Sequence, residues 1–257
     1  MSQRKLCVVL LSLLIVSWLG VLSAQAAQAQ VLDRGTLVVR TFLGIDLAKE
    51  EFTFERLENG NFKLSGQIKL LIFFGTSETF ILDKDLRLIS YQRQGTDIQG
   101  PLAVSVQVQG KTATMTRTRG KGDKQRTRRK IVTTETEFAI LDNNVLSEFV
   151  LLPLMAEARL AQSPGAKFSF TGLSPGQLRA SPDIIYKGKP LFIRVGKKVP
   201  QVERYITDGG LELLVNEGKL IGVSNEGDEK PFIFREDIFP NGFTILRPQR
   251  PRPGGLN

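Results

Sequence analysis

The chain has 257 residues, a formal net charge of +9, no histidine and a single cysteine, Cys7. Histidine is the usual general base and metal ligand near neutral pH, and the cysteine thiolate is the usual nucleophile and soft-metal ligand. Their absence beyond Cys7 excludes most common catalytic and metal-binding machinery. The composition favours a binding protein over an enzyme, and we expect no catalytic residue, no metal and no cofactor.

Residues 1–29 have the features of a secretory signal. A charged start precedes an apolar stretch over 6–22, and two small-residue cleavage patterns end at Ala26 and Ala29. An uncleaved anchor helix is the alternative, because the apolar stretch approaches membrane-spanning length. We expect cleavage near Ala26 or Ala29 and a secreted, periplasmic or cell-envelope protein with no transmembrane segment after cleavage.

The rest of the chain is long enough for one domain with a large core, which we place at 30–240. Residues 241–257 are rich in proline and glycine, which predicts a flexible tail. Without Arg4 and Lys5 of the signal, the net charge is still +7. A basic protein outside the cytoplasm can meet anionic lipids, cell-wall polymers or nucleic acid, although a solvated basic surface is the simpler explanation.

Apolar and polar residues alternate along most of the chain. Between Phe62 and Phe74 every second residue is apolar, except at Gly66, and the turn signal Asn59-Gly60 precedes this run. Similar alternation over 102–108 and 211–221 brings the count to about a dozen strands with short connections. This pattern predicts a mainly β protein with a long antiparallel meander sheet, apolar on one face.

One segment has helical spacing instead. Residues 142–144 offer helix-capping side chains, and apolar residues then recur at intervals of three and four up to Leu160. The segment is apolar nearly all round, which is typical of a buried helix, and Pro153 is expected to kink or split it. We therefore predict a central helix at about 143–162, wrapped by a curved sheet in a half-barrel or partly open barrel.

An incompletely filled interior would hold a hydrophobic or amphiphilic ligand such as an acyl chain. The alternative is that the same residues form an ordinary core. The candidate cavity residues are Phe62, Leu64, Ile68, Leu70, Ile72, Phe74, Phe149, Leu152 and Met155.

A basic cluster surrounds the turn Gly120-Lys121-Gly122. Its members are Arg117, Arg119, Lys121, Lys124, Arg126, Arg128, Arg129 and Lys130. No aromatic residue is interleaved, so we do not expect base stacking on nucleic acid. Phosphate groups or an anionic envelope surface are the expected partners, unless the charges serve only to keep an exposed hairpin soluble.

Paired carboxylates could support glycoside hydrolysis without histidine. The candidates are Glu135 with Glu137, the pair Glu50-Glu51, Asp142 and Glu148. Nothing in the sequence distinguishes them from solvated charges or helix caps.

The strand series, the run Leu141–Leu146 before an apolar helix and the later segments 196–200 and 234–237 resemble uncharacterised secreted bacterial β-rich domains. The architecture resembles the half-barrel, or β-clam, of periplasmic lipoprotein carriers and mycobacterial lipid-binding lipoproteins. The chain differs from the lipid-anchored members because it lacks a cysteine to carry a lipid. The resemblance implies an envelope role with carriage of an apolar ligand.

The sequence is consistent with three functions. The first is an exported, non-enzymatic protein that holds an apolar ligand between sheet and helix. The second is an envelope interaction protein that binds polyanions through the basic hairpin, and the third is a carboxylate-dependent hydrolase. A void of several hundred cubic ångströms beside the helix would favour the first, whereas close packing would favour an interaction or structural role.

Overall fold

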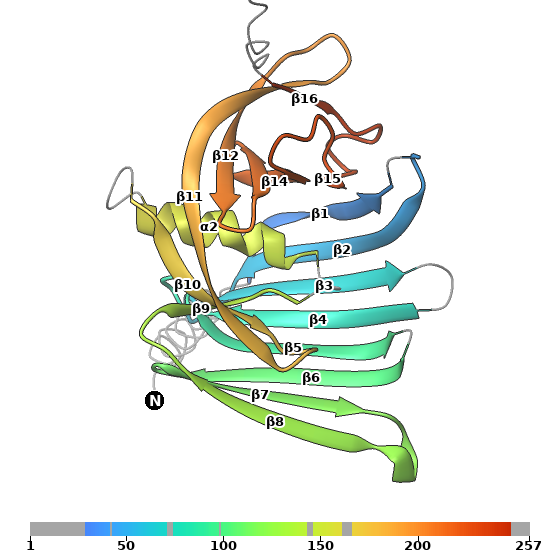
Figure 1. Cartoon of the computed structure of the whole chain (residues 1–257), viewed down its shortest axis with the longest axis vertical. Helices are drawn as coiled ribbons and strands as arrows, with labels where there is room; N and C mark the ends of the chain where they lie inside the picture. Colours follow the sequence, from blue (N-terminus) through green and yellow to red (C-terminus); the bar gives the residue numbers. More distant parts are fainter. Residues whose placement is uncertain are drawn as a thin grey trace, which may run out of the picture.

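Figure 1 shows the computed structural model of the chain, which describes residues 29–41, 43–70, 74–97, 99–142, 146–160 and 166–247. Nearly all of the predicted signal, 1–29, and the last part of the predicted tail, 248–257, lie outside the described residues. None of the helices that the structure describes has the length and apolar character needed to cross a membrane.

The described part of the chain forms sixteen strands, one α-helix and a short 3₁₀ turn (Figure 1). The helix is α2 (Glu148–Leu160), and the turn, η1 (Gly122–Lys124), joins β7 to β8. The strands are β1 (Gln30–Arg40), β2 (Asp46–Arg56), β3 (Phe62–Leu70), β4 (Phe74–Leu82), β5 (Leu88–Asp97), β6 (Gly100–Gln109), β7 (Thr112–Arg119), β8 (Arg126–Thr133), β9 (Glu137–Ile140), β10 (Phe168–Ser174), β11 (Arg179–Arg194), β12 (Gln201–Thr207), β13 (Leu211–Asn216), β14 (Lys219–Asn225), β15 (Ile233–Arg235) and β16 (Thr244–Leu246).

All sixteen strands belong to one curved, unclosed sheet, which confirms the predicted mainly β meander with a single helix. The order is β8-β7-β6-β5-β4-β3-β2-β1-β15-β14-β13-β12-β11-β10-β9, and β16 pairs with β11. Two details depart from a plain antiparallel meander. The short strand β15 joins the two halves by pairing with both β1 and β14, and β9 runs parallel to β10.

A buried arginine on β15 forms an ion pair with an aspartate on β1. Arg235 is only 1% exposed, and its guanidinium reaches Asp33 at 2.8 Å and Asp237 at 2.7 Å. It lies over Gly35, where a Cβ would collide with the guanidinium nitrogens. A glycine on β1 is therefore what allows a C-terminal arginine to fasten the two halves of the sheet together.

Alternation gives the N-terminal half of the sheet an inner and an outer face, because successive side chains of a strand point to opposite faces. Phe52, Leu64, Phe80 and Tyr91 are buried on the inner face, whereas their neighbours along each strand are mostly polar and at least partly exposed. The sheet is curved, and its inner face is the concave face, which is turned toward α2 (Figure 1).

The helix α2 lies within this curve, as predicted, and Glu157 is its only exposed residue. Leu152 and Met155 contact the same small hollow as Phe80 of β4 and Phe138 of β9, which places α2 between the two halves of the sheet. The expected split at Pro153 does not occur, because the helix continues from Glu148 to Leu160 with the proline inside it.

A second apolar cluster includes part of the segment that was predicted to be a flexible tail. Phe243 and Ile245 are buried against Ile193 and Phe234, and β16 pairs with β11. The prediction of a flexible tail from residue 241 is therefore wrong for 241–247. The prediction relied on the proline and glycine content of the last residues and overlooked Phe243 and Ile245. These two apolar residues cover the other face of the C-terminal strands.

Shortening the side chain of the most buried leucine in α2 should destabilise the fold. Leu152 is 1% exposed, so Leu152→Ala is expected to lower the free energy of unfolding by about 2–5 kcal/mol, measured by urea denaturation. Leu47→Ala is the matched control, because Leu47 is 44% exposed on β2, and it should cost less than about 0.5 kcal/mol. Equal losses in the two variants would contradict the burial of α2.

Candidate functional site

The space between sheet and helix is filled by side chains. Leu64, Ile68, Leu152 and Met155 are buried in the main core, and Phe62 and Phe149 pack partly buried against it. Leu70 and Phe74 belong to β3 and β4, but their side chains, like the whole of Ile72, lie outside the described residues. The hollow beside α2 measures about 10 Å³, which is far below the roughly 300 Å³ of a small ligand pocket.

A cluster of buried ionisable groups interrupts this apolar interior at the N-terminal end of α2. Glu50 of β2 is fully buried and Glu78 of β4 is 4% exposed. Both flank Gly66 of β3, where a Cβ would collide with Glu50 Oε1 and lie 2.9 Å from Glu78 Oε1. The missing side chain at Gly66 therefore creates the room in which the two carboxyl groups converge.

Glu50 anchors the start of the helix. Its Oε2 accepts hydrogen bonds from the backbone N–H groups of Leu146 at 2.7 Å and Ser147 at 3.2 Å. These N–H groups precede the first turn of α2 and have no partner within the helix itself. A carboxylate is also favoured there by the helix dipole. A side chain from β2 thus caps the start of the helix, whereas residues 143 and 144, from which the sequence predicts a cap, lie outside the described residues.

The pKa values of both carboxyl groups are raised by burial, and that of Glu78 is raised more strongly than that of Glu50. Burial raises the pKa of Glu78 well above its ordinary value of 4.5, and the negative charge of Glu50 raises it further. Within the described residues, Glu50 Oε1 has no hydrogen-bond donor as long as both groups are ionised. A protonated Glu78 supplies that donor, while Ser147 and Tyr91 donate their hydroxyl hydrogens to Glu78.

A second carboxyl pair closes the cluster. Glu148 Oε2 accepts the backbone N–H of Asp142 at 2.7 Å, and burial raises the pKa of Glu148 well above 4.5. Asp142 forms a buried ion pair with Arg93 at 3.0 Å and accepts the N–H of Gly176. Arg93 thus offsets the negative charge of Asp142.

The buried carboxyl cluster ties β2 and β5 to the start of α2 and to the segment before it. Two carboxyl groups that cleave a glycosidic bond must flank the substrate, whereas Glu50 and Glu78 lean over the same glycine beneath α2. The pair Glu135 and Glu137 does not converge either, since Glu135 contacts Lys111 and Glu137 contacts Arg159. Among the described residues, no group of three or more acidic, histidine or cysteine side chains could hold a metal ion.

The predicted basic cluster lies on the hairpin β7–β8, at one free edge of the sheet (Figure 1). Two of its eight members are already engaged. Arg119 makes a two-pronged ion pair with Asp97 at 2.7 and 2.8 Å, and Arg117 donates to the carbonyl of Gly176 at 2.7 Å. These two arginines are half-buried and tie the hairpin to the rest of the fold.

The other six cations are exposed, and none of them forms an ion pair with any described residue. They are Lys121, Lys124, Arg126, Arg128, Arg129 and Lys130, and we call them the basic edge. Antiparallel pairing with β7 places Arg126, Arg128 and Lys130 on the inner face of β8 and Arg129 on its outer face. Among the described strands, β8 pairs with β7 alone, so its other edge has no strand partner there.

No protein-family model, curated protein or solved structure matches the chain.

The sequence located the basic edge but missed the buried carboxyl cluster as a unit. Glu50 was one of several acidic candidates, and Glu78 was not singled out. The alternation nevertheless carries a signal for this cluster. Glu50 and Glu78 occupy inward-facing positions, each two residues before a buried phenylalanine, Phe52 or Phe80. Gly66 interrupts the apolar face between them, which marks the place where the carboxyl groups meet.

The raised pKa of Glu78 predicts that stability falls as pH rises. The folded state binds the proton more tightly than the unfolded state, so stability from this group is complete below pH 4.5 and is lost as pH rises through the folded-state pKa. Each unit of pKa difference corresponds to about 1.4 kcal/mol. Glu78→Gln keeps a hydrogen-bond donor toward Glu50, so it should reduce this loss in urea unfolding measured from pH 5 to 9.

Glu58→Gln is the control for this experiment, because Glu58 is exposed in the turn between β2 and β3. It should leave the pH dependence of stability unchanged. A Glu78→Gln protein with the same pH dependence as the parent would show that Glu78 is already ionised in the folded state.

Proposed function

We propose that the protein is an exported, non-enzymatic binding protein that holds polyanions of the cell envelope on the basic edge. The observation that carries the proposal is the set of six exposed cations on β8 and the turn before it, none of which forms an ion pair with a described residue. The predicted signal, 1–29, supports the location, and the packed interior favours an interaction role over carriage of a ligand.

The charge of the basic edge is high for its size. Along β8, four of the five residues from Arg126 to Lys130 are cationic, and η1 adds Lys124 beside Lys121. Cations held this close together repel one another, and a polyanion relieves that repulsion while releasing its own counterions. Arginine also offers paired N–H groups that match phosphate or carboxylate oxygens.

The position of the hairpin suits a surface contact. Gly176 and Asp97 fix Arg117 and Arg119, so β7 is held in place near the turn of the hairpin. The neighbouring cations are therefore presented on a rigid β-ribbon, which lowers the entropy lost on binding.

The packing beside α2 does not support the alternative hypothesis that an apolar ligand lies between sheet and helix. The hollow beside α2 would have to expand many-fold to accept an acyl chain, which requires α2 to separate from β4 and β9. The Glu50 contacts with the start of the helix oppose that movement.

Loss of the basic edge should abolish polyanion binding. The purified protein is expected to bind long-chain inorganic polyphosphate, and at least tenfold more weakly at 200 mM than at 50 mM NaCl, by fluorescence anisotropy. The fourfold variant Arg126→Gln, Arg128→Gln, Arg129→Gln and Lys130→Gln should lose at least tenfold in affinity at the lower salt concentration.

The matched control removes four exposed cations elsewhere: Lys84→Gln, Lys189→Gln, Lys197→Gln and Lys230→Gln. Net charge then falls by the same amount, so this variant should keep most of the parent affinity. Equal losses in both variants would mean that only net charge matters. No binding by the parent protein would exclude the proposal.

A further inference from the structure

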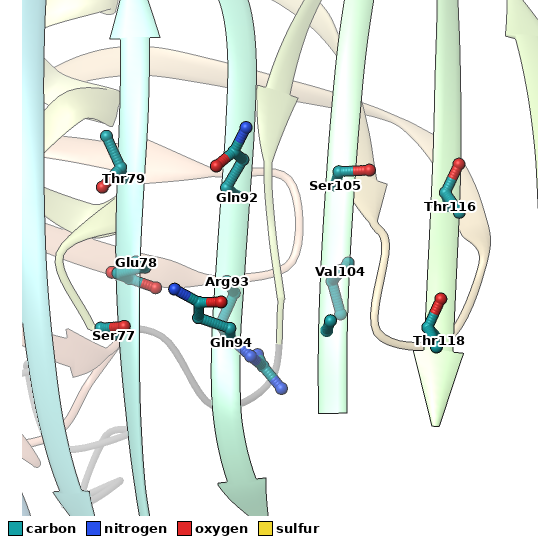
Figure 2. A pocket seen from close by; sticks show the side chains of 11 residues that line it. Ser77, Glu78, Thr79, Gln92, Arg93, Gln94, Val104, Ser105, Thr116 and Thr118 are labelled. Carbon is teal, nitrogen blue, oxygen red and sulfur yellow. The ribbon is translucent and has the colours of Figure 1, made fainter. Parts of the chain in front are cut away.

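The outer face of the N-terminal half-sheet carries a long polar trough, which we define as two adjoining hollows of about 230 and 470 Å³. The two hollows share Ser77 of β4 and Gln94 of β5. Figure 2 shows the first hollow, with its side chains standing on four neighbouring strands. The trough thus crosses the strands from β3 to β7.

Two rows of uncharged side chains line the trough, and all of them except Ala103 are polar. In the first row, Thr79, Gln92, Ser105 and Thr116 are directly paired partners on β4, β5, β6 and β7. Glu78 and Arg93 also line the first hollow, but their side chains are buried and their charged ends contact Ser147 and Asp142 on the inner face. The first row is therefore a neutral series of hydroxyl and amide groups.

The second row runs beside the first. It consists of Gln67, Ser77, Gln94, Ala103 and Thr118, again in direct register across β3 to β7. Short side chains on β6 and β7 make the hollow. At its β3 end, Gly95 approaches the backbone of Gly75 so closely that a Cβ at residue 95 would collide with the Gly75 carbonyl.

Cations stand at both ends of the trough. Lys69 of β3 lines the second hollow, and Arg129 of β8 is the register partner of Thr116. Directly paired residues on one face have Cβ atoms about 5 Å apart, so Arg129 adjoins the first row. The same face continues beyond Gln67 to Glu51 on β2, whose carboxylate would repel an anion, so the site ends at β3.

We propose that this trough and the basic edge together bind an acidic polysaccharide, with sugar hydroxyls on the two rows and carboxylates on Lys69 and Arg129. The inference rests on the proposed function and names the class of polyanion. Hydroxyl and amide groups both donate and accept hydrogen bonds, as sugar hydroxyls do. Adjacent strands lie about 4.8 Å apart, which is close to the length of one sugar unit in an extended chain.

Bare phosphate polymers fit the trough less well than a polysaccharide. Phosphate oxygens only accept hydrogen bonds, so they gain little from carbonyl oxygens of Gln92 and Gln94 and would favour a lining of cations. A chain in which carboxylated and uncharged sugars alternate matches a surface with cations at its ends and neutral groups between them.

Hyaluronan oligosaccharides are a suitable probe, because carboxylated and uncharged sugars alternate along them. The parent protein should bind them, measured by titration calorimetry, and should bind dextran of equal length at least tenfold more weakly. The double variant Gln92→Leu, Thr116→Val removes the polar groups with little change of shape. It should lose at least tenfold in affinity for hyaluronan and less than twofold for polyphosphate.

Two further variants make the test independent of one substitution. Ser105→Tyr fills the trough with a side chain that suits an exposed strand, and it should also lose hyaluronan binding. Thr53→Val alters a threonine on the same face of β2, outside the trough, and should bind as the parent does.

The possible failures are distinguishable. Hyaluronan binding that survives both trough variants would overturn the role of the trough. Binding of polyphosphate, or of phosphatidylglycerol vesicles, without any binding of hyaluronan would overturn the inference and leave the proposed function standing. A parent protein that binds none of these probes would overturn both.

Discussion

The fold depends on one contact between a strand and a helix that are almost one hundred residues apart in sequence. The carboxylate of Glu50 accepts the backbone N–H groups of Leu146 and Ser147, and this contact fixes where α2 begins. Gly66 gives the carboxylate its space, and the pKa of the neighbouring Glu78 is raised well above its ordinary value by burial and by the charge of Glu50. With this end of α2 fastened to β2, the helix can fill the curve of the sheet along its whole length.

The contact of Glu50 with the start of α2 explains why the interior of the curved sheet is filled, whereas its outer face is exposed. The helix and β9 occupy the space that a carrier would leave for its ligand, and only about 10 Å³ remains beside them. Binding chemistry is consequently left to the surfaces of the sheet. The outer face of the N-terminal half carries neutral polar rows, and its free edge carries cations that have no partner among the described residues.

The general architecture was predictable because it depends on local patterns. Alternation showed which residues of β2 to β7 face inward, and helical spacing located α2 within a few residues of its observed ends. The basic edge was also predictable, since its charges are adjacent in sequence. The resemblance to lipid carriers stays a prediction, because it concerned an interior volume that alternation alone does not determine.

The sequence by itself determined the class of fold, the buried helix and the charged hairpin, because each follows from the spacing of side chains within one segment. Only the tertiary structure decided the contacts between distant segments. Register across β2, β3 and β4 brings Glu50 and Glu78 together over Gly66, Arg235 fastens β15 beside β1, and pairing from β4 to β7 aligns the rows of the trough. These contacts depend on strand register and on sheet curvature, which the whole chain sets by packing around α2.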